Sequence, residues 1–291
     1  MDIFLAPDAS SRVTRQRLKD IASLARRKGR RLQGEFLVEG VRSVEAALAA
    51  GALLVEVLVA DVAHAGGDDR IAELAEAAGV PVHRVAAREL DRVGDARTSQ
   101  GVLAVARSVV AGALADDVGG PVLLLDGVQD PGNVGALVRT AAWYGVAAVV
   151  ADENTADFES PKAVRASMGG IWDLGLVRVP DLVPVLDQLA AAGVQAWGAD
   201  LGGTPVDAWA PDLSTALVMG SEAHGLSPEV STWLRRQPPP RQGQRQLAGS
   251  RFVHIPPRRR LAPADGADEP RGVESLNVVV AGGVLMSRWL G

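Results

Sequence analysis

The stretch PVLLLDGVQDPGNVGALVRTAAWYGVAAVVA, residues 121–151, decides the fold of the larger part of the chain. The apolar residues 122–125 predict a buried strand, a Gly- and Pro-containing turn follows, and residues 133–145 predict a helix. Residues 147–151 predict a second strand. Short apolar strands without alternation are typical of a parallel sheet covered on both faces. The turn between the first strand and the helix lies where such sheets bind ligands.

The glycines of this stretch fit neither the GxGxxG pattern of dinucleotide-binding folds nor the GxxxxGK[ST] pattern of P-loop proteins. A Rossmann dehydrogenase is therefore a poor interpretation. Asn133 is predicted to cap the helix that follows the turn. Taken alone, the stretch is also compatible with an ordinary strand–turn–helix joint.

Two later segments again place polar residues after predicted strands. LVMGSEAHGLS, residues 217–227, ends a strand with Gly-Ser-Glu. FVHIPP, residues 252–257, is followed after a basic stretch by VESLNVVVAGGVL, residues 273–285. Ser275 is predicted to cap a C-terminal helix over residues 275–289. Each of these segments, taken singly, is also compatible with an ordinary turn that leads into a capped helix.

The rest of the chain predicts a second, smaller domain and a linker. Residues 1–106 alternate between predicted strands and helices and indicate a small α/β domain. Within it, residues 12–31 predict one basic amphipathic helix. Residues 107–119 contain Gly and Asp and are predicted to be a linker, which leaves residues 120–291 as the larger domain.

The charge is unevenly distributed along the chain. The formal net charge is −5, yet residues 12–31 contain nine Lys and Arg against one acid. Residues 235–271 contain nine Arg against three acids. Basic patches on an acidic body indicate a polyanionic partner such as RNA. The alternative is a solvated helix face and a basic loop.

Several classes of protein are not indicated by the composition. The chain has no cysteine, which excludes disulfides, thiolate catalysis and cysteine-based zinc sites. The four histidines show no metal-ligand spacing, so we expect no metal. No apolar run reaches the roughly 18 residues that span a bilayer, and the N-terminus does not resemble a secretory signal. We expect a cytoplasmic protein without a membrane partner.

Taken together and in order, the three segments resemble the motifs of the SpoU (TrmH-type) RNA ribose 2′-O-methyltransferases of the SPOUT superfamily. The first domain is similar to the N-terminal substrate-binding domain of that family in the stretches 34–48 and 99–105. The matching motif residues are Asn133-Val134-Gly135 with Arg139-Thr140-Ala141, Gly220-Ser221-Glu222 with Gly225-Leu226, and Ile255-Pro256 with Ser275-Leu276-Asn277-Val278.

The resemblance implies an α/β fold: a SPOUT-type parallel sheet with a C-terminal trefoil knot, preceded by a small α/β RNA-binding domain. It implies transfer of a methyl group from S-adenosylmethionine to a ribose 2′-hydroxyl in RNA, ribosomal RNA first of all, by a homodimer. Alternatives stay open. They are a tRNA 2′-O-methyltransferase, an antibiotic-resistance rRNA methyltransferase, and a non-catalytic RNA-binding or ribosome-assembly factor.

The resemblance also implies roles for individual residues. We expect the Arg139 cation to stabilise charge on the attacking oxygen, because arginine is always protonated, and Glu222 to hold Arg139. The expected catalytic set is Asn133, Arg139, Glu222, Ser275 and Asn277. The expected cofactor-binding set is Met219, Gly220, Ile255, Ser275 and Leu276. The expected RNA-binding set is Arg26, Arg27 and Arg30.

The sequence departs from the family pattern by two Arg- and Pro-rich additions. They lie around residues 237–250 and 257–271, on either side of Ile255-Pro256. They are expected to be loops that form basic arms over RNA or that cover or deform the cofactor pocket.

Overall fold

The structure is a computed structural model that describes residues 13–61, 67–95, 100–238, 251–257 and 275–291. The chain forms two compact units. Unit 1 consists of Met1–Val109 and Asp157–Asp173, and unit 2 consists of Val110–Ala156 and Leu174–Gly291. The chain therefore passes from one unit to the other three times. No described helix is long and apolar enough to cross a membrane.

Unit 1 is built on a mixed sheet with the strand order β1-β4-β2-β3. β4 is antiparallel to both of its neighbours, β1 and β2, whereas β2 and β3 are parallel. The elements are α1 (Arg15–Ser23), α2 (Arg27–Gln33), β1 (Glu35–Glu39), α3 (Val41–Ala49), β2 (Leu54–Ala60), α4 (Gly67–Ala77), β3 (Val82–Val85), α5 (Ala87–Val93), β4 (Val102–Arg107), α7 (Pro161–Ser167) and the 3₁₀ helix η1 (Gly170–Trp172).

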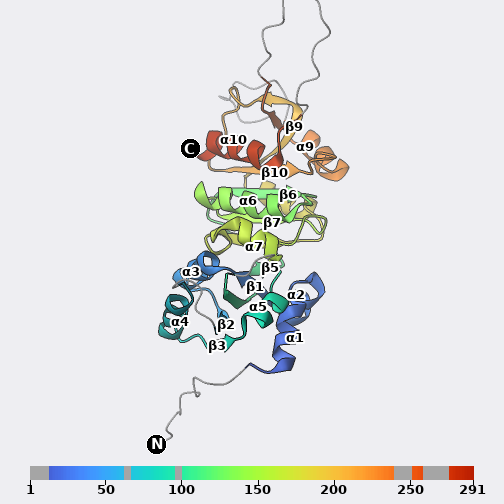
Figure 1. The fold of residues 1–291 in the computed structure, drawn as a ribbon. Helices are drawn as coiled ribbons and strands as arrows, with labels where there is room; N and C mark the ends of the chain where they lie inside the picture. Colours follow the sequence, from blue (N-terminus) through green and yellow to red (C-terminus); the bar gives the residue numbers. More distant parts are fainter. Residues whose placement is uncertain (1–12, 62–66, 96–99, 239–250, 258–274) are drawn as a thin grey trace, which may run out of the picture. The chain divides into compact units, whose positions relative to one another are not determined.

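Helices cover both faces of this sheet, as Figure 1 shows. On one face, apolar residues of α1 and α5 share a core with Leu37 of β1 and Leu58 of β2. On the other face lie α3, α4 and α7. There Phe36 stacks on Trp172 with ring centroids 5.6 Å apart. Burial of the Phe36 side chain contributes roughly 1.5–3 kcal/mol to folding.

The segment Asp157–Asp173 belongs to unit 1 although it follows β7 of unit 2. Buried Glu159 accepts hydrogen bonds from the Ser108 hydroxyl at 2.7 Å and the Val109 N–H at 2.9 Å. Arg165 pairs with Glu39 of β1 and, at 3.2 Å, with Asp95. These contacts tie the segment to β1 and to the end of β4.

The single helix predicted over residues 12–31 is wrong, because the structure has two helices, α1 and α2. Arg26 has an extended backbone between them, with φ −105° and ψ 141°. The chain folds back so tightly that a Cβ on Gly29 would lie 2.1 Å from the Ser23 carbonyl oxygen. Only glycine fits at that position. The turn therefore divides the basic stretch between two helices.

Unit 2 contains a sheet with the strand order β11-β9-β10-β6-β7-β8-β5, in which every pairing is parallel. This confirms the expected α/β class with a parallel sheet. The elements are β5 (Val110–Ala111), β6 (Val122–Asp126), α6 (Pro131–Trp143), β7 (Ala148–Ala151), β8 (Gly175–Arg178), α8 (Val183–Ala191), β9 (Gln195–Pro205), β10 (Thr215–Gly220), α9 (Pro228–Arg236), β11 (Phe252–His254) and α10 (Val278–Leu290).

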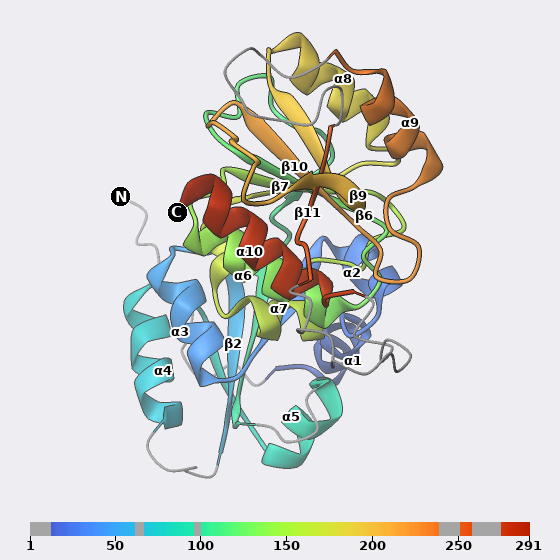
Figure 2. The same cartoon turned by 90° about the horizontal axis from the view of Figure 1, so that it is seen from above.

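Both faces of this sheet are buried, which explains its unbroken apolar strands. α8 and α9 cover the face that contains Val122 and Leu124 of β6. α6 and α10 cover the opposite face and lie side by side in Figure 2. Gly282 allows this close packing, since a Cβ there would lie 2.7 Å from the Leu137 side chain of α6.

Glycines shape strand β9, and two local predictions elsewhere in unit 2 need correction. β9 continues through Gly202 and Gly203 without a turn. A Cβ on Gly203 would lie 2.4 Å from the backbone of Phe252, so this glycine allows close strand contact rather than a turn. The segment 107–119 includes the edge strand β5. The C-terminal helix begins at Val278 rather than at residue 275.

Candidate functional site

Unit 2 contains a pocket of about 580 Å³ at the carboxyl ends of strands β10 and β11. Three chain segments that are far apart in the sequence line it: the end of β10 with the following turn, the end of β11, and the entry to α10. Part of β9 completes the wall. The lining residues are Ala199, Asp200, Leu201, Met219, Gly220, Ser221, Glu222, Ala223, His224, Gly225, Val253, His254, Ile255, Ser275, Leu276, Val278, Ala281 and Leu285.

The five residues expected to bind a cofactor all line this pocket. Met219 and Gly220 end β10, Ile255 follows β11, and Ser275 and Leu276 precede α10. The structure thus places the five residues around one cavity.

The turn after β10 is closed by backbone hydrogen bonds. Ser221 and Gly225 each donate an N–H to the other's carbonyl oxygen, at 2.9 Å and 2.8 Å. A Cβ on Gly220 would lie 2.3 Å from the backbone of Gly225, and Gly225 has a φ of +69°. Both positions therefore require glycine. The turn holds Glu222 at the pocket wall.

Asp126, at the end of β6, stabilises the end of this turn. No role for this residue was predicted from the sequence. Its carboxylate accepts the N–H of Ser227 at 2.6 Å. Burial raises the pKa of the Asp126 carboxyl, and the bonds from Ser227 oppose that rise. A polar residue directly after an apolar strand was the signal that could have identified it. Asp126 fixes the place where the turn enters α9.

A chain of polar side chains joins the three motif segments. Asn277 donates its Nδ2 to Oδ1 of Asn133 at 3.4 Å. Asn133 donates its own Nδ2 to Oε1 of Glu222. Three of the five expected catalytic residues are thus in contact, although they are separated by as many as 144 positions in the sequence.

The caps expected for these helices are wrong. Asp130, rather than Asn133, caps α6, because its carboxylate accepts the N–H groups of Gly132 at 2.7 Å and Asn133 at 3.0 Å. Asn277, rather than Ser275, caps α10 by accepting the Val279 N–H at 2.9 Å. The Asn133 side chain is therefore available for Glu222.

Arg139 does not pair with Glu222 as expected. It is exposed on α6, and its guanidinium has no hydrogen bond or ion pair within the part of the chain that the structure describes. Arg139 lies six residues after Asn133, which on an α-helix turns its side chain away from the Asn133 face. The cation is free to meet a phosphate or a developing negative charge.

The first Arg- and Pro-rich addition is flanked by Pro238 and Arg251, which meet next to the start of β11. Its flanking residues meet, since Arg251 donates to the Pro238 carbonyl oxygen at 3.0 Å and 2.9 Å and to Gln195 at 2.6 Å. Burial lowers the pKa of Arg251. Arg251 precedes β11 and Gln195 begins β9, whereas the pocket is lined by later residues of these strands, Val253 and His254 of β11 and Ala199, Asp200 and Leu201 of β9.

The second addition begins beside the pocket. Ile255 and Ser275, which bracket it, both line the cavity. Residues 239–250 and 258–274 themselves lie outside the described residues. The two additions therefore differ in where their ends are anchored.

The residues expected to bind RNA lie in or next to α2 of unit 1, but they differ in exposure. Arg26 and Arg27 are exposed. Arg30 is only 5% exposed, and its guanidinium pairs with Asp157 at 2.6 Å and donates to the carbonyl oxygens of Leu24 and Ala25. Arg30 is therefore a structural residue and does not lie on the exposed side of α2. Nothing near it in the sequence signals this, because Asp157 is 127 positions away.

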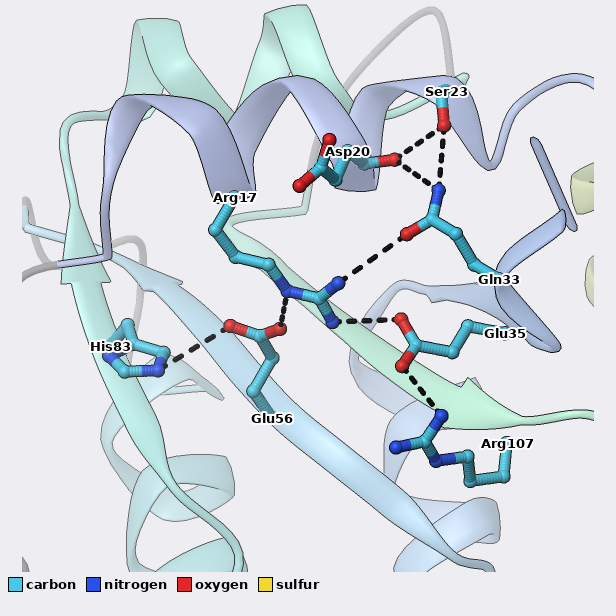
Figure 3. A network of polar contacts seen from close by, with 8 residues as sticks. All are labelled: Arg17, Asp20, Ser23, Gln33, Glu35, Glu56, His83 and Arg107. Carbon is cyan, nitrogen blue, oxygen red and sulfur yellow. Dashed lines mark hydrogen bonds and ion pairs between the residues drawn. The ribbon is translucent and has the colours of Figure 1, made fainter.

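Arg17 of α1 is held inside a similar network, which Figure 3 shows. Its guanidinium donates to Glu56 at 2.6 Å and to Glu35 at 2.9 Å, and both carboxylates are buried. Glu35 also pairs with Arg107, and Glu56 with His83. The network fastens α1 to the sheet and neutralises one cation of the basic stretch.

The exposed side of α2 presents a basic surface, which we name the α2 surface. It borders a hollow of about 520 Å³. Its members are Arg27, Lys28, Arg31 and Leu32, of which Leu32 is 82% exposed.

Comparison with known proteins decides the family. The model of the SpoU rRNA Methylase family matches residues 120–236, and that of the MRM3-like substrate binding domain matches residues 15–104. The 23S rRNA (guanosine(2553)-2′-O)-methyltransferase RlmP of Bacillus subtilis is 34% identical over 212 residues, which cover 72% of this chain and 81% of that protein. The chain belongs to the SpoU rRNA methylase family. As a SpoU protein it has the α/β fold with a parallel sheet that unit 2 shows.

Solved structures agree with this assignment. The SpoU methyltransferase AviRb from Streptomyces viridochromogenes is similar at 26% identity with a TM-score of 0.70, covering 94% of this chain and 95% of that one. An AdoMet-bound rRNA methyltransferase from Sinorhizobium meliloti has a TM-score of 0.73 at 24% identity and covers 97% of each chain. The second likeness shows the fold alone.

Proposed function

We propose that this SpoU protein transfers a methyl group from S-adenosylmethionine to a ribose 2′-hydroxyl of RNA, and that the RNA is ribosomal. The observation that supports this most is a pocket lined by the second and third motif segments, whose wall residue Glu222 is linked through Asn133 of the first segment to Asn277. The names of related proteins, which include 23S rRNA 2′-O-methyltransferases from several bacteria, support the choice of ribosomal RNA.

The pocket suits S-adenosylmethionine in size and in chemistry. Its volume of about 580 Å³ lies within the range of roughly 300–1,000 Å³ that is usual for small-molecule sites. Met219, Leu276 and Leu285 supply apolar wall for an adenine ring. Asp200 supplies negative charge, which suits a cofactor with a cationic sulfonium and an ammonium group. The cofactor, when bound, supplies an electrophilic methyl group.

The protein's own residues would orient and stabilise the reacting ribose. We propose that Asn133 and Asn277 hold the Glu222 carboxylate in one orientation. Exposed Ser275 would hydrogen-bond the cofactor or the ribose at the pocket wall. The Arg139 cation would stabilise negative charge on the attacking oxygen and bind an adjacent phosphate. Met219, Gly220 and Ile255 would bind the cofactor, largely through backbone groups.

Unit 1 would bind the RNA. We propose residues 1–106 as the substrate-binding domain, 107–119 as the linker and 120–291 as the methyltransferase domain. The packing of Asp157–Asp173 with unit 1 adds a segment to the first of these. Arg26 and the α2 surface would contact phosphates, which set affinity more than sequence preference. Because its substrate would be ribosomal RNA, we propose that the protein works in the cytoplasm.

Two finer features of the fold are also proposals. A C-terminal trefoil knot is supported by the course of the chain, which reaches the sheet edge at β11 and then returns with α10 to β10 and α6. A homodimer is supported by exposed apolar side chains on α6 and α10, namely Trp143 at 85%, Val280 at 52% and Val284 at 39% exposure. Burying such side chains favours association. Sedimentation of wild type and Trp143→Glu tests the dimer, which the variant should weaken.

Calorimetric titration of the purified protein with S-adenosylmethionine tests the pocket. We expect binding close to one site per chain. Ala281→Phe places a ring in the cavity and should weaken binding at least tenfold, whereas Ser287→Phe on the exposed side of the same helix should not. Equal affinities in all three proteins would place the cofactor elsewhere. No binding by folded wild type, with or without ribosomal RNA, would favour a non-catalytic RNA-binding protein.

A further inference from the structure

The polar chain beside the pocket has a fixed direction. Oδ1 of Asn277 accepts the backbone N–H of Val279 at 2.9 Å, so this atom must be the carbonyl oxygen. The amide nitrogen of Asn277 therefore faces Oδ1 of Asn133. Asn133 must then present its own NH₂ group to Glu222. The helix cap of α10 thus sets the orientation of both amides.

Glu222 is the acceptor at the end of this chain. Because an amide N–H can only donate, Oε1 of Glu222 has to accept. The second oxygen, Oε2, accepts no hydrogen bond within the described part of the chain. Glu222 is exposed and lines the pocket. A carboxylate with one oxygen anchored and the other open to a substrate has the arrangement of a proton acceptor.

We propose that Glu222 is the general base that removes the proton of the ribose 2′-hydroxyl, with Asn133 and Asn277 as its positioning residues. This inference rests on the proposed methyl transfer. As the 2′-oxygen forms its bond to the methyl carbon, the carbon–sulfur bond breaks and its electron pair stays on sulfur. The hydroxyl proton passes to Oε2 of Glu222, and solvent later removes it.

A carboxylate is a strong enough base for this proton transfer because the proton leaves while the oxygen–carbon bond is forming. Glu has an ordinary pKa of about 4.3, far below that of an alcohol, so it cannot form a free alkoxide in advance. The Arg139 cation would stabilise the negative charge that develops on the oxygen as its proton leaves, and bond formation to carbon makes the hydroxyl strongly acidic. A carboxylate in contact with it then accepts the proton readily.

Other titratable groups at the pocket are less suited to the role. Arg139 does not line the pocket and, because it is always protonated, has no proton-accepting form. His254 already uses Nδ1 in a 2.7 Å contact with the Gly203 carbonyl oxygen. Asp200 lies on β9 and makes its hydrogen bond to Gly202 of the same strand. His224 lies two residues from Glu222 on the same turn and is the competing candidate, but no other side chain orients it among the described residues.

The test compares single-turnover methylation of an unmodified bacterial 23S rRNA transcript by wild type, Glu222→Gln, Glu222→Ala and His224→Gln. Glutamine keeps an oxygen that accepts from Asn133 but cannot take a proton. We expect Glu222→Gln to slow the reaction about 10²–10⁴-fold. Its calorimetric affinity for S-adenosylmethionine should stay within about threefold of wild type. Glu153→Gln, which removes an exposed carboxylate outside the pocket, is the matched control and should keep the wild-type rate.

Chemical rescue separates a proton acceptor from a structural residue. Added formate should restore part of the rate to Glu222→Ala, which leaves space for it, and should not restore Glu222→Gln. Three results would overturn the inference: a rate within threefold of wild type in Glu222→Gln, an equal loss of cofactor affinity, or a larger loss in His224→Gln than in Glu222→Gln. A wild-type protein that methylates no ribose would instead refute the proposed function, and the base role with it.

Discussion

The pocket of unit 2 and the basic helices of unit 1 use polar side chains in opposite ways. Beside the pocket, two neutral amides orient a single carboxylate and leave one of its oxygens open. In α1 and α2, carboxylates surround arginines and occupy their donors: Glu35 and Glu56 hold Arg17, and Asp157 holds Arg30. The first arrangement leaves one carboxylate oxygen of Glu222 open to a substrate. The second leaves few N–H donors of Arg17 and Arg30 for a ligand.

The difference shows that the basic stretch has two separate tasks. Arg17 and Arg30 stabilise unit 1 from within. Arg27, Lys28 and Arg31 are exposed on the α2 surface and are available to phosphates. A count of basic residues therefore overstates the charge that can meet RNA. Variants of the buried arginines and variants of the exposed cations should therefore have separable effects on stability and on RNA binding.

The largest effect should come from breaking the buried ion pair of unit 1. Asp157→Ala leaves the Arg30 guanidinium buried without its carboxylate and should lower the free energy of unfolding by about 3–5 kcal/mol. Denaturant unfolding measures this loss. Asp69→Ala is the matched control, because it breaks the Arg84–Asp69 pair, which is also short at 2.9 Å but exposed. That change should cost at most about 1 kcal/mol. Equal losses would mean that burial of Arg30 has no special role.

Removal of the exposed cation of unit 2 should affect chemistry and not stability. We expect Arg139→Ala to reduce the methylation rate by about 10²–10³-fold, the usual loss for one group that stabilises developing charge. Cofactor affinity and unfolding should stay near wild type, because Arg139 has no partner among the described residues. A loss of cofactor binding in calorimetry would make Arg139 a cofactor ligand instead.

The α2 surface should set the salt dependence of RNA binding. In the triple variant Arg27→Gln, Lys28→Gln and Arg31→Gln, the slope of log affinity against log salt should fall by roughly 2–3, because each lost phosphate contact removes about 0.7–0.9. Filter binding at several salt concentrations measures it. The variant Arg70→Gln with Arg84→Gln, on α4 and β3, should leave the slope unchanged. An unchanged slope in the triple variant would exclude α2 from the RNA surface.

A smaller effect concerns the pH dependence of stability. Burial raises the pKa of Glu159 above its ordinary 4.5, so the folded protein holds this proton more tightly than the unfolded chain. Stability should therefore be lost as the pH rises from about 4.5 through the raised pKa. Glu159→Gln cannot ionise, and its amide oxygen can accept from Ser108 and Val109. The stability of wild type relative to this variant should fall across that pH range.

The smallest effect is expected from the first addition. Because Arg251 holds Pro238, and neither residue lines the pocket, replacing residues 239–250 with a short Gly-Ser turn should leave cofactor affinity within about twofold. Calorimetry measures this. A clear loss of affinity would show that the addition reaches the pocket.

The sequence predicted the pocket better than the basic helices, for a physical reason. Met219, Gly220, Ile255, Ser275 and Leu276 stand in short motifs whose order is specific, so they could be assigned to one cavity. The burial of Arg30 depends on Asp157, 127 positions away, and no local pattern records such a contact.

Local errors had local causes. Asn133 was predicted to cap α6, although Asp130 followed by Pro131 is a stronger cap signal, since proline suits the first helical position. Asn277 was not predicted to cap α10 because Ser275, two residues earlier, is also a common N-cap residue. The extended course of β9 through Gly203 could not be predicted, because it depends on close contact with β11.

Incubation of the protein with isotopically labelled S-adenosylmethionine and unmodified 23S rRNA, followed by mass spectrometry of the nucleosides, tests the central claim most directly. We expect label on the 2′-oxygen of a ribose with the wild-type protein, and loss of that label with Glu222→Gln. Label on a base, or no label in RNA under conditions where the cofactor binds, would contradict it.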